Sequence, residues 1–352
     1  MHSRLAVGLA LLCCLFGGTM SGQDRMPSNR TLTVVPGIKV GHFTYSERPT
    51  GCTVILTEAG AVAGVDVRGA APGTRETDLL NPVNSVQQVF GVVLAGGSAF
   101  GLDAATGVMK YLDERNIGFK VAGVNVPIVP AAILIDLWVG AKPGAPKIFP
   151  TADCGYAAAK SASSGPVAEG NVGAGAGATV GKTAGIGRAM KAGVGSSALV
   201  MPDGTIVAAL VAVNALGDVI DPSTGKVVAG VRTPDGKGLA DARKILRGGG
   251  ESQSQIGGNT TLAVVATNVV LTKTEATKVA QMAHDGYARA ISPVHTPADG
   301  DTIFTLATGA KAGAADVGRI GALAAEVVSD AILRAARQAH GIPGYPAATD
   351  LK

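Results

Sequence analysis

Residues 248–268 read GGGESQSQIGGNTTLAVVATN, and this stretch joins two differently built parts of the chain. The run up to Gly258 consists of Gly, Ser, Gln, Glu and one Ile, a composition typical of a flexible, exposed linker. Thr261–Ala266 is a short apolar run with β-branched residues, which predicts a buried strand. The chain therefore passes abruptly from a loose linker into a core strand, and such a junction is a candidate site.

The segment after this junction predicts the order strand, helix, strand, helix. Thr272 and Glu275 form a capping-box pair that starts a helix running through Ile291. Ile303–Ala307 predicts another strand, and Asp316–His340 predicts a long helix with an apolar face. We expect these elements to form a compact unit after the linker.

Upstream of the linker, short apolar runs alternate with helical patterns. Helices are predicted at Leu102–Arg115 and Thr151–Ser161, with a weaker helical pattern at Leu239–Leu246. The segment from 198 to 231 indicates successive β-hairpins. Strands are predicted at Leu32–Val35, Thr53–Leu56, Val62–Val67, Val92–Leu94 and Ile128–Ile135. Because βα units are mixed with hairpins, we expect mixed or antiparallel sheets.

The composition excludes several classes of protein. The 352 residues include 50 glycines, with 47% hydrophobic residues, 16% charged residues and a net charge of +4. This hydrophobicity at low net charge excludes a disordered chain, and the glycines lack the period of collagen. No run of Lys or Arg exceeds two residues, so no nucleic-acid partner is expected. Past the first thirty residues, no apolar run is long enough for a membrane span.

Residues 1–22 predict export. Arg4 precedes the apolar stretch Leu5–Phe16, and small and polar residues follow, which is the order of a cleaved secretory signal peptide. The alternative is a membrane anchor, for which the stretch is short. We therefore expect a secreted or periplasmic protein without membrane contact after signal removal. Cys52 and Cys154 then remain, and they can pair in an oxidising compartment or stay as two buried free thiols.

Three motif-like patterns lack the context that their chemistry needs. Ala176–Thr183 (AGATVGKT) matches a loose phosphate-loop pattern, but no apolar strand precedes it and glycines interrupt any following helix. Gly96–Gly101 misses the Gly-x-Ser-x-Gly elbow by one residue. His295 with Asp299 and Asp301 has no further His or Cys ligand at fixed spacing. Neither a metal nor another cofactor is expected.

The junction itself suits a nucleophile. A threonine hydroxyl needs a base beside it, and an N-terminal threonine supplies its own α-amino group, whose pKa of about 7.7–8.0 suits neutral pH. For Thr260 to become N-terminal, its hydroxyl must attack the Asn259 carbonyl and give an ester that water hydrolyses. The preceding glycines permit the strained backbone that this step requires. A threonine at a strand start is also commonplace, so this feature alone leaves a purely structural role open.

Six long motifs follow one another along the chain: GVDVRGAAPGTRETDLL (64–80), LAGGSAFGLDAATGVM (94–109), VPAAILIDL (129–137), GNVGAGAGATVGK (170–182), GGNTTLAVVATN (257–268) and HTPADGDTIFTLATG (295–309). In this order they resemble the DmpA-type self-processing aminopeptidases, also described as L-aminopeptidase D-esterases and β-peptidyl aminopeptidases. The resemblance covers roughly Leu32 to His340. It implies an α/β (α+β) fold, a four-layer α/β/β/α sandwich similar to N-terminal-nucleophile hydrolases but with different connectivity.

The same resemblance implies how the precursor is divided. Cleavage between Asn259 and Thr260 would give an α chain, 23–259, and a β chain, 260–352, that remain together in one domain. The family also implies a homo-oligomer, a tetramer of such αβ units. These assignments are expectations from the resemblance alone.

Carried over residue by residue, the resemblance assigns a site. Thr260 takes the nucleophile position, Asn214 matches an asparagine that helps to hold the oxyanion, and Tyr156 matches a tyrosine near the substrate. Asp299 and Asp301 stand where many members carry Ser-Gly-Glu. Two close carboxylates raise the pKa of one of them, so one can be protonated or bind the substrate ammonium. Structural alternatives remain: a turn residue for Asn214, a core aromatic for Tyr156 and a loop cap for Asp299.

These residues predict an exported, self-activating amidohydrolase. It would remove N-terminal residues from short peptides, amino-acid amides or esters through an acyl-enzyme on Thr260. One alternative is an acyltransferase of the ornithine-acetyltransferase type, which shares the threonine chemistry and which export disfavours. Another is an uncleaved binding protein without catalysis.

Overall fold

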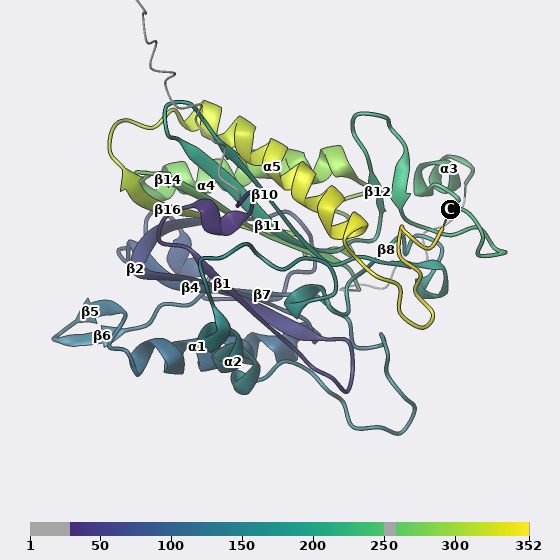
Figure 1. The fold of residues 1–352 in the computed structure, drawn as a ribbon, viewed down its shortest axis with the longest axis horizontal. Coiled ribbons are helices and arrows are strands. Elements are labelled where there is room, and N and C mark those ends of the chain that lie inside the picture. Colours follow the sequence, from purple (N-terminus) through teal and green to yellow (C-terminus); the bar gives the residue numbers. More distant parts are fainter. Residues whose placement is uncertain (1–28, 250–257, 352) are drawn as a thin grey trace, which may run out of the picture.

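The computed structural model describes residues 29–249 and 258–351, so the expected signal peptide and most of the linker lie outside it. Nine of the described strands form one mixed sheet, in the order β10-β11-β14-β16-β2-β4-β7-β3 with β1 on β2 (Figure 1). Their bounds are β1 Lys39–Thr44, β2 Gly51–Val67, β3 Thr74–Arg75, β4 Gln88–Ala95, β7 Ala131–Ile133, β10 Val194–Val200, β11 Ile206–Asn214, β14 Thr260–Val269 and β16 Thr302–Lys311. The predicted mixed sheet is thus confirmed.

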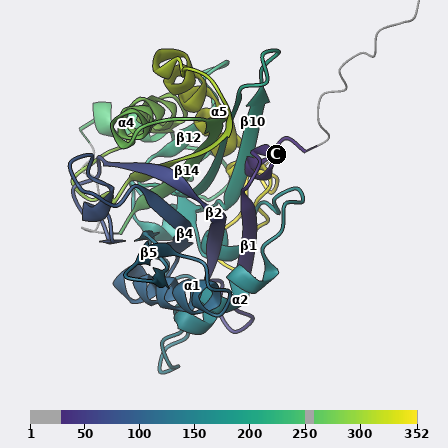
Figure 2. The ribbon, with the colours of Figure 1, turned by 90° about the vertical axis from the view of Figure 1, so that its left-hand side faces the viewer.

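Helices cover both outer sides of this sheet. Helices α4 (Lys273–Ala290) and α5 (Val317–Arg337) pack on one side, and α1 (Ala104–Asp113) and α2 (Ala152–Ser161) on the other (Figures 1 and 2). The remaining elements are short: η1 Leu32–Val34, η2 Asp78–Leu80, η3 Ser98–Asp103, β5 Phe119–Val121, β6 Val124–Val126, η4 Gly173–Gly175, β8 Thr179–Val180, η5 Ile186–Arg188, β9 Met190–Lys191, β12 Asp218–Ile220, β13 Val227–Ala229, α3 Ala242–Arg247 and β15 Ile291–Ser292. Within the described ranges, no helix is long and apolar enough to cross a membrane.

Three apolar cores separate four layers. Successive side chains of a strand point to opposite faces, so along β14 Ala263 and Val265 pack toward α4 and α5, while Leu262 and Val264 face the middle core. A third core, which includes Val54 of β2, lies under α1 and α2. The order of layers is helices, sheet, sheet, helices, which confirms the predicted α/β/β/α sandwich.

Strand β2 joins the two sheet layers. It is 17 residues long: β1 pairs with its first half, β16 with its last six residues, and β4 with residues 52–56 and again with 61–62. The register with β4 shifts between Leu56 and Ala61, which lets one strand serve both layers. The runs at 53–56 and 62–67, predicted as two strands, are therefore one.

The segment after the linker supplies the middle of the sheet rather than a separate unit. β14 pairs antiparallel with β11 and parallel with β16, and β16 pairs with β2. The predicted capping box at Thr272 and Glu275 is confirmed: Thr272 is the N-cap of α4, which begins at Lys273, and Glu275 lies in its first turn. The prediction of a strand at Leu32–Val35 was wrong. A 3₁₀ turn forms there because it places Leu32 and Val35 on one side, where both are buried in the middle core.

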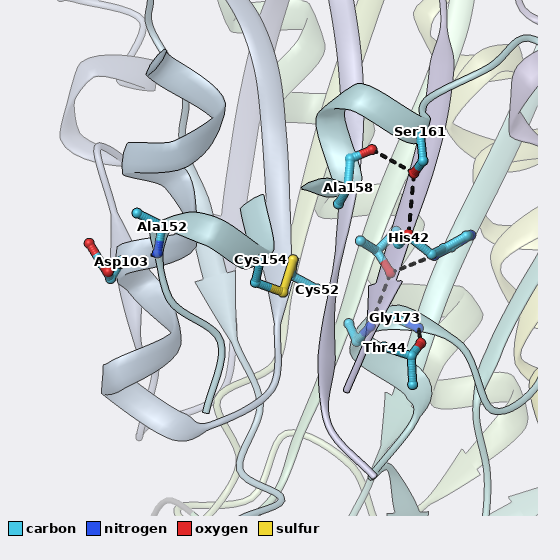
Figure 3. Close-up of a disulfide and its surroundings, with 11 residues drawn as sticks. His42, Thr44, Cys52, Asp103, Ala152, Cys154, Ala158, Ser161 and Gly173 are labelled. Atoms are coloured by element: carbon cyan, nitrogen blue, oxygen red, sulfur yellow. Dashed lines mark hydrogen bonds between the residues drawn. A yellow bond between two sulfur atoms is a disulfide. The ribbon is translucent and has the colours of Figure 1, made fainter. Parts of the chain in front are cut away.

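A disulfide joins Cys52 of β2 to Cys154 of α2 in the outer core (Figure 3), which decides between the two states that the sequence left open. The two cysteines are 102 residues apart, so the bond closes a long loop in the unfolded chain. We expect the Cys52→Ala, Cys154→Ala double variant to lose about 2–5 kcal/mol of unfolding free energy. Urea unfolding of both proteins without reductant measures this loss, and coincident midpoints would contradict it.

Candidate functional site

Strand pairing brings the ends of several neighbouring strands together on one side of the molecule. Thr260, the first residue of β14, pairs with Asn214, the last residue of β11. Thr302, the first residue of β16, pairs with Leu262 on one side and with Val67, the last residue of β2, on the other. The loop that enters β16 therefore lies beside the junction of linker and strand.

The hydroxyl of Thr260 lies against the peptide bond that precedes it. Thr260 Oγ1 donates to the carbonyl oxygen of Asn259 at 2.5 Å, and the backbone N–H of Gly300 donates to the same oxygen at 2.9 Å. Residue 300 needs to be glycine here, because a Cβ would lie 2.6 Å from Thr260 Oγ1. Asn259 and Thr260 are only 1% and 2% exposed. The hydroxyl thus lies against the carbonyl that it would attack, and the Gly300 N–H is a donor placed to stabilise the oxyanion that would develop there.

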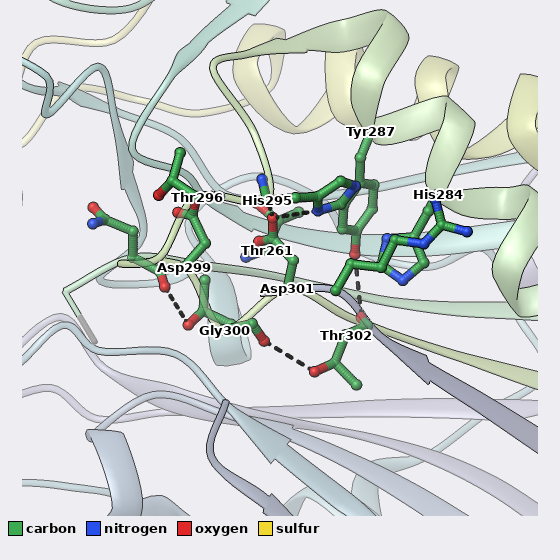
Figure 4. Close-up of polar contacts among 12 residues, drawn as sticks. Thr261, His284, Tyr287, His295, Thr296, Asp299, Gly300, Asp301 and Thr302 are labelled. Atoms are coloured by element: carbon green, nitrogen blue, oxygen red, sulfur yellow. Dashed lines mark hydrogen bonds and ion pairs between the residues drawn. The ribbon is translucent and has the colours of Figure 1, made fainter. Parts of the chain in front are cut away.

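The two predicted carboxylates flank Gly300 and are both buried (Figure 4). Asp301 Oδ1 accepts the backbone N–H of Thr261 at 2.8 Å, and Asp299 Oδ2 accepts that of Thr296 at 2.7 Å. Asp299 Oδ1 is buried without a hydrogen-bond partner among residues 29–249 and 258–351. Burial, and then the charge of Asp301, raise the pKa of the Asp299 carboxyl against the opposing effect of its bonds from Thr296. This carboxylate is therefore a candidate proton acceptor.

The motif at 64–80 holds this loop in place. The N–H groups of Arg68 and Ala71 donate to the carbonyl oxygens of Asp301 and Asp299, at 3.0 and 2.8 Å. Gly69 permits this close approach, because a Cβ there would lie 2.2 Å from the Asp299 carbonyl oxygen. The first conspicuous motif of the sequence thus contributes the support for the acidic loop.

Asn214 is adjacent to Thr260 by register, but its amide is engaged elsewhere in the intact chain. Its Oδ1 accepts the N–H of Thr179 at 3.0 Å and Lys182 Nζ at 2.9 Å, and its Nδ2 donates to the carbonyl of Ile135 at 3.1 Å. The NH₂ group is therefore aimed at a backbone carbonyl, and its part in holding an oxyanion stays a prediction.

Lys182 is a site residue that the sequence reasoning did not single out. Its Nζ donates to Asn214 O at 3.0 Å, to Asn214 Oδ1 and to Gly258 O at 3.4 Å, directly before the expected cleavage point. Burial lowers the pKa of this ammonium to about 7, although Asp299, Asp136 and Asp301 favour the charged form. The available signal is that Lys182 ends the motif GNVGAGAGATVGK (170–182), a Gly- and Ala-rich stretch that also matches a loose phosphate-loop pattern.

Tyr156 is the predicted site residue that the structure does not bring to this cluster. It lies on α2 in the outer helical layer, where its hydroxyl donates to Glu114 at 2.7 Å. Its ring packs edge-on against Tyr111, and the Lys110 ammonium lies 5.4 Å from its centroid. These contacts are all with α1 and its C-terminal end, and a substrate contact for Tyr156 stays a prediction.

Comparisons with known proteins identify the family of this chain. The model of peptidase family S58 matches residues 30–349. An uncharacterized aminopeptidase of Mycobacterium bovis is 39% identical over 349 residues, covering 91% of this chain and 97% of the relative. A 6-aminohexanoate-oligomer endohydrolase of Kocuria sp. is 32% identical over 315 residues, covering 86% of this chain and 84% of the relative.

Two solved structures share the fold at low sequence identity. A β-aminopeptidase of Burkholderia sp. has a TM-score of 0.63 and 22% identity, over 91% of this chain and 90% of that one. The L-aminopeptidase D-Ala-esterase/amidase of Ochrobactrum anthropi, described as a variant of the Ntn hydrolase fold, has a TM-score of 0.64 and 20% identity, over 90% and 89%. The chain therefore belongs to peptidase family S58, the DmpA family that its motifs resemble, and is a hydrolase of amide bonds.

Proposed function

We propose that this chain is the self-cleaving precursor of an exported aminopeptidase whose nucleophile is Thr260. The observation that carries the proposal is the contact of Thr260 Oγ1 with the Asn259 carbonyl, whose oxygen also accepts the Gly300 N–H. A hydroxyl and an oxyanion donor on the same peptide bond are the two groups that an acyl shift needs.

The cleavage reaction can be written with these groups. The Thr260 oxygen attacks the Asn259 carbonyl carbon while its proton passes to a base, for which Asp299 is the candidate. The C–N bond of the tetrahedral intermediate then breaks, and the departing nitrogen takes a proton and becomes the α-amine of Thr260. Water hydrolyses the remaining ester, giving an Asn259 carboxylate and a free Thr260 hydroxyl.

The mature enzyme would use the same hydroxyl on substrates. The new α-amine is the base for Thr260, which attacks the carbonyl after the N-terminal residue of a short peptide, amide or ester. The acidic pair Asp299 and Asp301 supplies a negative region for the substrate ammonium. The names of the relatives, an aminopeptidase and an oligoamide endohydrolase, support a substrate with an amide bond.

The two chains should stay associated after cleavage. Strand β14 of the proposed β chain is hydrogen-bonded between β11 of the α chain and β16, and β16 pairs with β2 of the α chain. Separation of the two chains would break the β14–β11 and β16–β2 ladders and expose to water the apolar cores on either side of the sheet. The tetramer of αβ units is proposed from the family resemblance alone.

Export is part of the same proposal. Residues 1–22 have the order of a signal peptide, and the pairing of Cys52 with Cys154 suits a secreted or periplasmic environment, where disulfides persist. The wild-type protein purified from the periplasm or medium of an expression host should therefore begin near residue 23.

Intact mass of the wild-type protein under denaturing conditions tests the cleavage. We expect two fragments, the smaller spanning residues 260–352 and giving threonine in the first cycle of N-terminal sequencing. A single uncleaved chain in a freshly prepared, active sample would refute the proposal. Release of free amino acid from an amino-acid amide, with or without an added amine acceptor, separates a hydrolase from an acyltransferase.

A further inference from the structure

A cluster of aromatic and imidazole rings lies behind the acidic loop (Figure 4). His284 and Tyr287 come from α4, and His295 comes from the loop that leads to β16. The His295 ring lies nearly parallel to Tyr287, with centroids 5.8 Å apart, and meets His284 edge-on at 4.8 Å. None of these three side chains has a part in the cleavage chemistry described above.

His295 is joined to the site through Asp301. Its Nδ1 lies 2.9 Å from Asp301 Oδ2, and its backbone N–H donates to the same oxygen at 3.1 Å. The other oxygen, Oδ1, accepts the N–H of Thr261, the residue after the nucleophile. In the described part of the chain, His295 is the one side chain that donates to this carboxylate, so Asp301 connects the imidazole to the start of β14.

The surroundings of the ring favour one tautomer. His295 Nε2 is buried and has no hydrogen-bond partner in residues 29–249 and 258–351. With the proton on that nitrogen alone, it would be buried without an acceptor, and the Nδ1 lone pair would face the Asp301 oxygen 2.9 Å away with no hydrogen between the two acceptors. The ring is therefore best satisfied with a proton on Nδ1 that is donated to Asp301.

Neither of the two neighbouring titratable side chains, His284 and Tyr287, replaces His295 as the donor to Asp301. Burial lowers the pKa of His284 to about 4, and its Nε2 lies 3.1 Å from the carbonyl oxygen of Asp66 on β2. Burial also raises the pKa of Tyr287 well above its usual value, and its hydroxyl donates to the Thr302 carbonyl. Both side chains are neutral near pH 7. The charges around the cluster belong to Asp66 of β2, to Arg68 directly after that strand, to Asp299 and Asp301 of the loop, and to Lys182.

The backbone at His295 is also held in an unusual conformation. Its φ is +56°, in the left-handed region that non-glycine residues seldom adopt. The bond from the His295 N–H to Asp301 Oδ2 ties the residue down in that conformation. Backbone and side chain thus contact the same carboxylate oxygen, which fixes its position from two directions.

We propose that His295 is a positioning residue that acts through Asp301 to align the nucleophile. The Nδ1–H of His295 holds the Asp301 carboxylate with Oδ1 on the Thr261 N–H, and this bond fixes the backbone that presents Thr260. This inference rests on the proposed role of Thr260 as nucleophile.

Two variants of the full-length protein distinguish loss of the hydrogen-bond donor from loss of the imidazole ring. His295→Gly removes the side chain and accepts the positive φ without strain, whereas His295→Asn keeps an N–H donor near the Nδ1 position and tolerates the same φ. We expect His295→Gly to lower kcat by about 10- to 100-fold, the scale of one charge-assisted hydrogen bond, with little change in KM. His295→Asn should restore most of the lost kcat.

The control is His340→Ala, which removes an exposed histidine three residues beyond the C-terminal end of α5. Wild-type kcat in His295→Gly would overturn the inference, as would equal losses of kcat in the Gly and Asn variants or a loss that appears in KM alone. Should His295→Gly not fold, nitrogen NMR of the wild-type imidazoles decides, and a His295 proton on Nε2 would overturn the inference. Wild-type protein with no fragment starting at Thr260 would instead refute the proposed function.

Discussion

Replacing Thr260 by alanine is expected to leave one full-length chain without measurable hydrolysis of amino-acid p-nitroanilides. The hydroxyl is the group that contacts the Asn259 carbonyl, so its loss removes the nucleophile of self-cleavage. It also removes the nucleophile of substrate hydrolysis, and loss of a catalytic hydroxyl lowers turnover by about 10⁴-fold or more. Intact mass and a p-nitroanilide assay on the same preparation measure both effects.

Two further variants show whether the effect belongs to this hydroxyl. Thr260→Ser keeps the oxygen, so cleavage and hydrolysis should both persist. Thr305→Val removes another buried threonine hydroxyl, on β16, that has no hydrogen-bond partner in the described ranges, and it should leave cleavage unchanged. A Thr260→Ala chain that still separates into two fragments would show that the nucleophile lies elsewhere.

Local signals explain what the sequence could predict of the fold. The capping box at Thr272 is formed within four residues, and the alternation in β14 follows from strand geometry. The sequence pattern predicts two strands where β2 is one, because Glu58 and Gly60 interrupt the apolar pattern at the point where the strand changes its pairing partner. Such an interruption is indistinguishable from a turn without knowledge of the neighbouring strands.

The candidate site also contains residues that local sequence could predict and contacts that it could not. Thr260 and the acidic pair could be found because each lies within a long motif at the start of a strand. The contacts of Lys182 and His295 could not, because they depend on side chains that tertiary packing brings together. The amide of Asn214 shows the limit of a carried-over role. The family resemblance places Asn214 in the site, and its strand does pair with Thr260, but its engagement by Lys182, 32 residues upstream, follows from tertiary packing.

Replacing Lys182 by methionine is expected to slow self-cleavage by about 100-fold, the scale of a lost electrostatic contact at a reacting group. The ammonium holds the Gly258 carbonyl just before the cleaved bond and orients the Asn214 amide through its Oδ1. It is also the buried positive charge that lowers the pKa of Asp299. Accumulation of full-length precursor over time, followed on denaturing gels after synthesis, measures the rate.

Lys191 provides the matched control for this variant. It is also fully buried, burial lowers its pKa to about 7 as well, and its Nζ donates to backbone carbonyls, including Gly175 at 2.8 Å and Ala178 at 3.1 Å. Lys191→Met should therefore destabilise the fold comparably, because it too leaves carbonyls without a donor. It should not slow cleavage in the fraction that folds, because none of its acceptors belongs to the cleaved segment. Equal slowing in both variants would mean that Lys182 acts through stability alone.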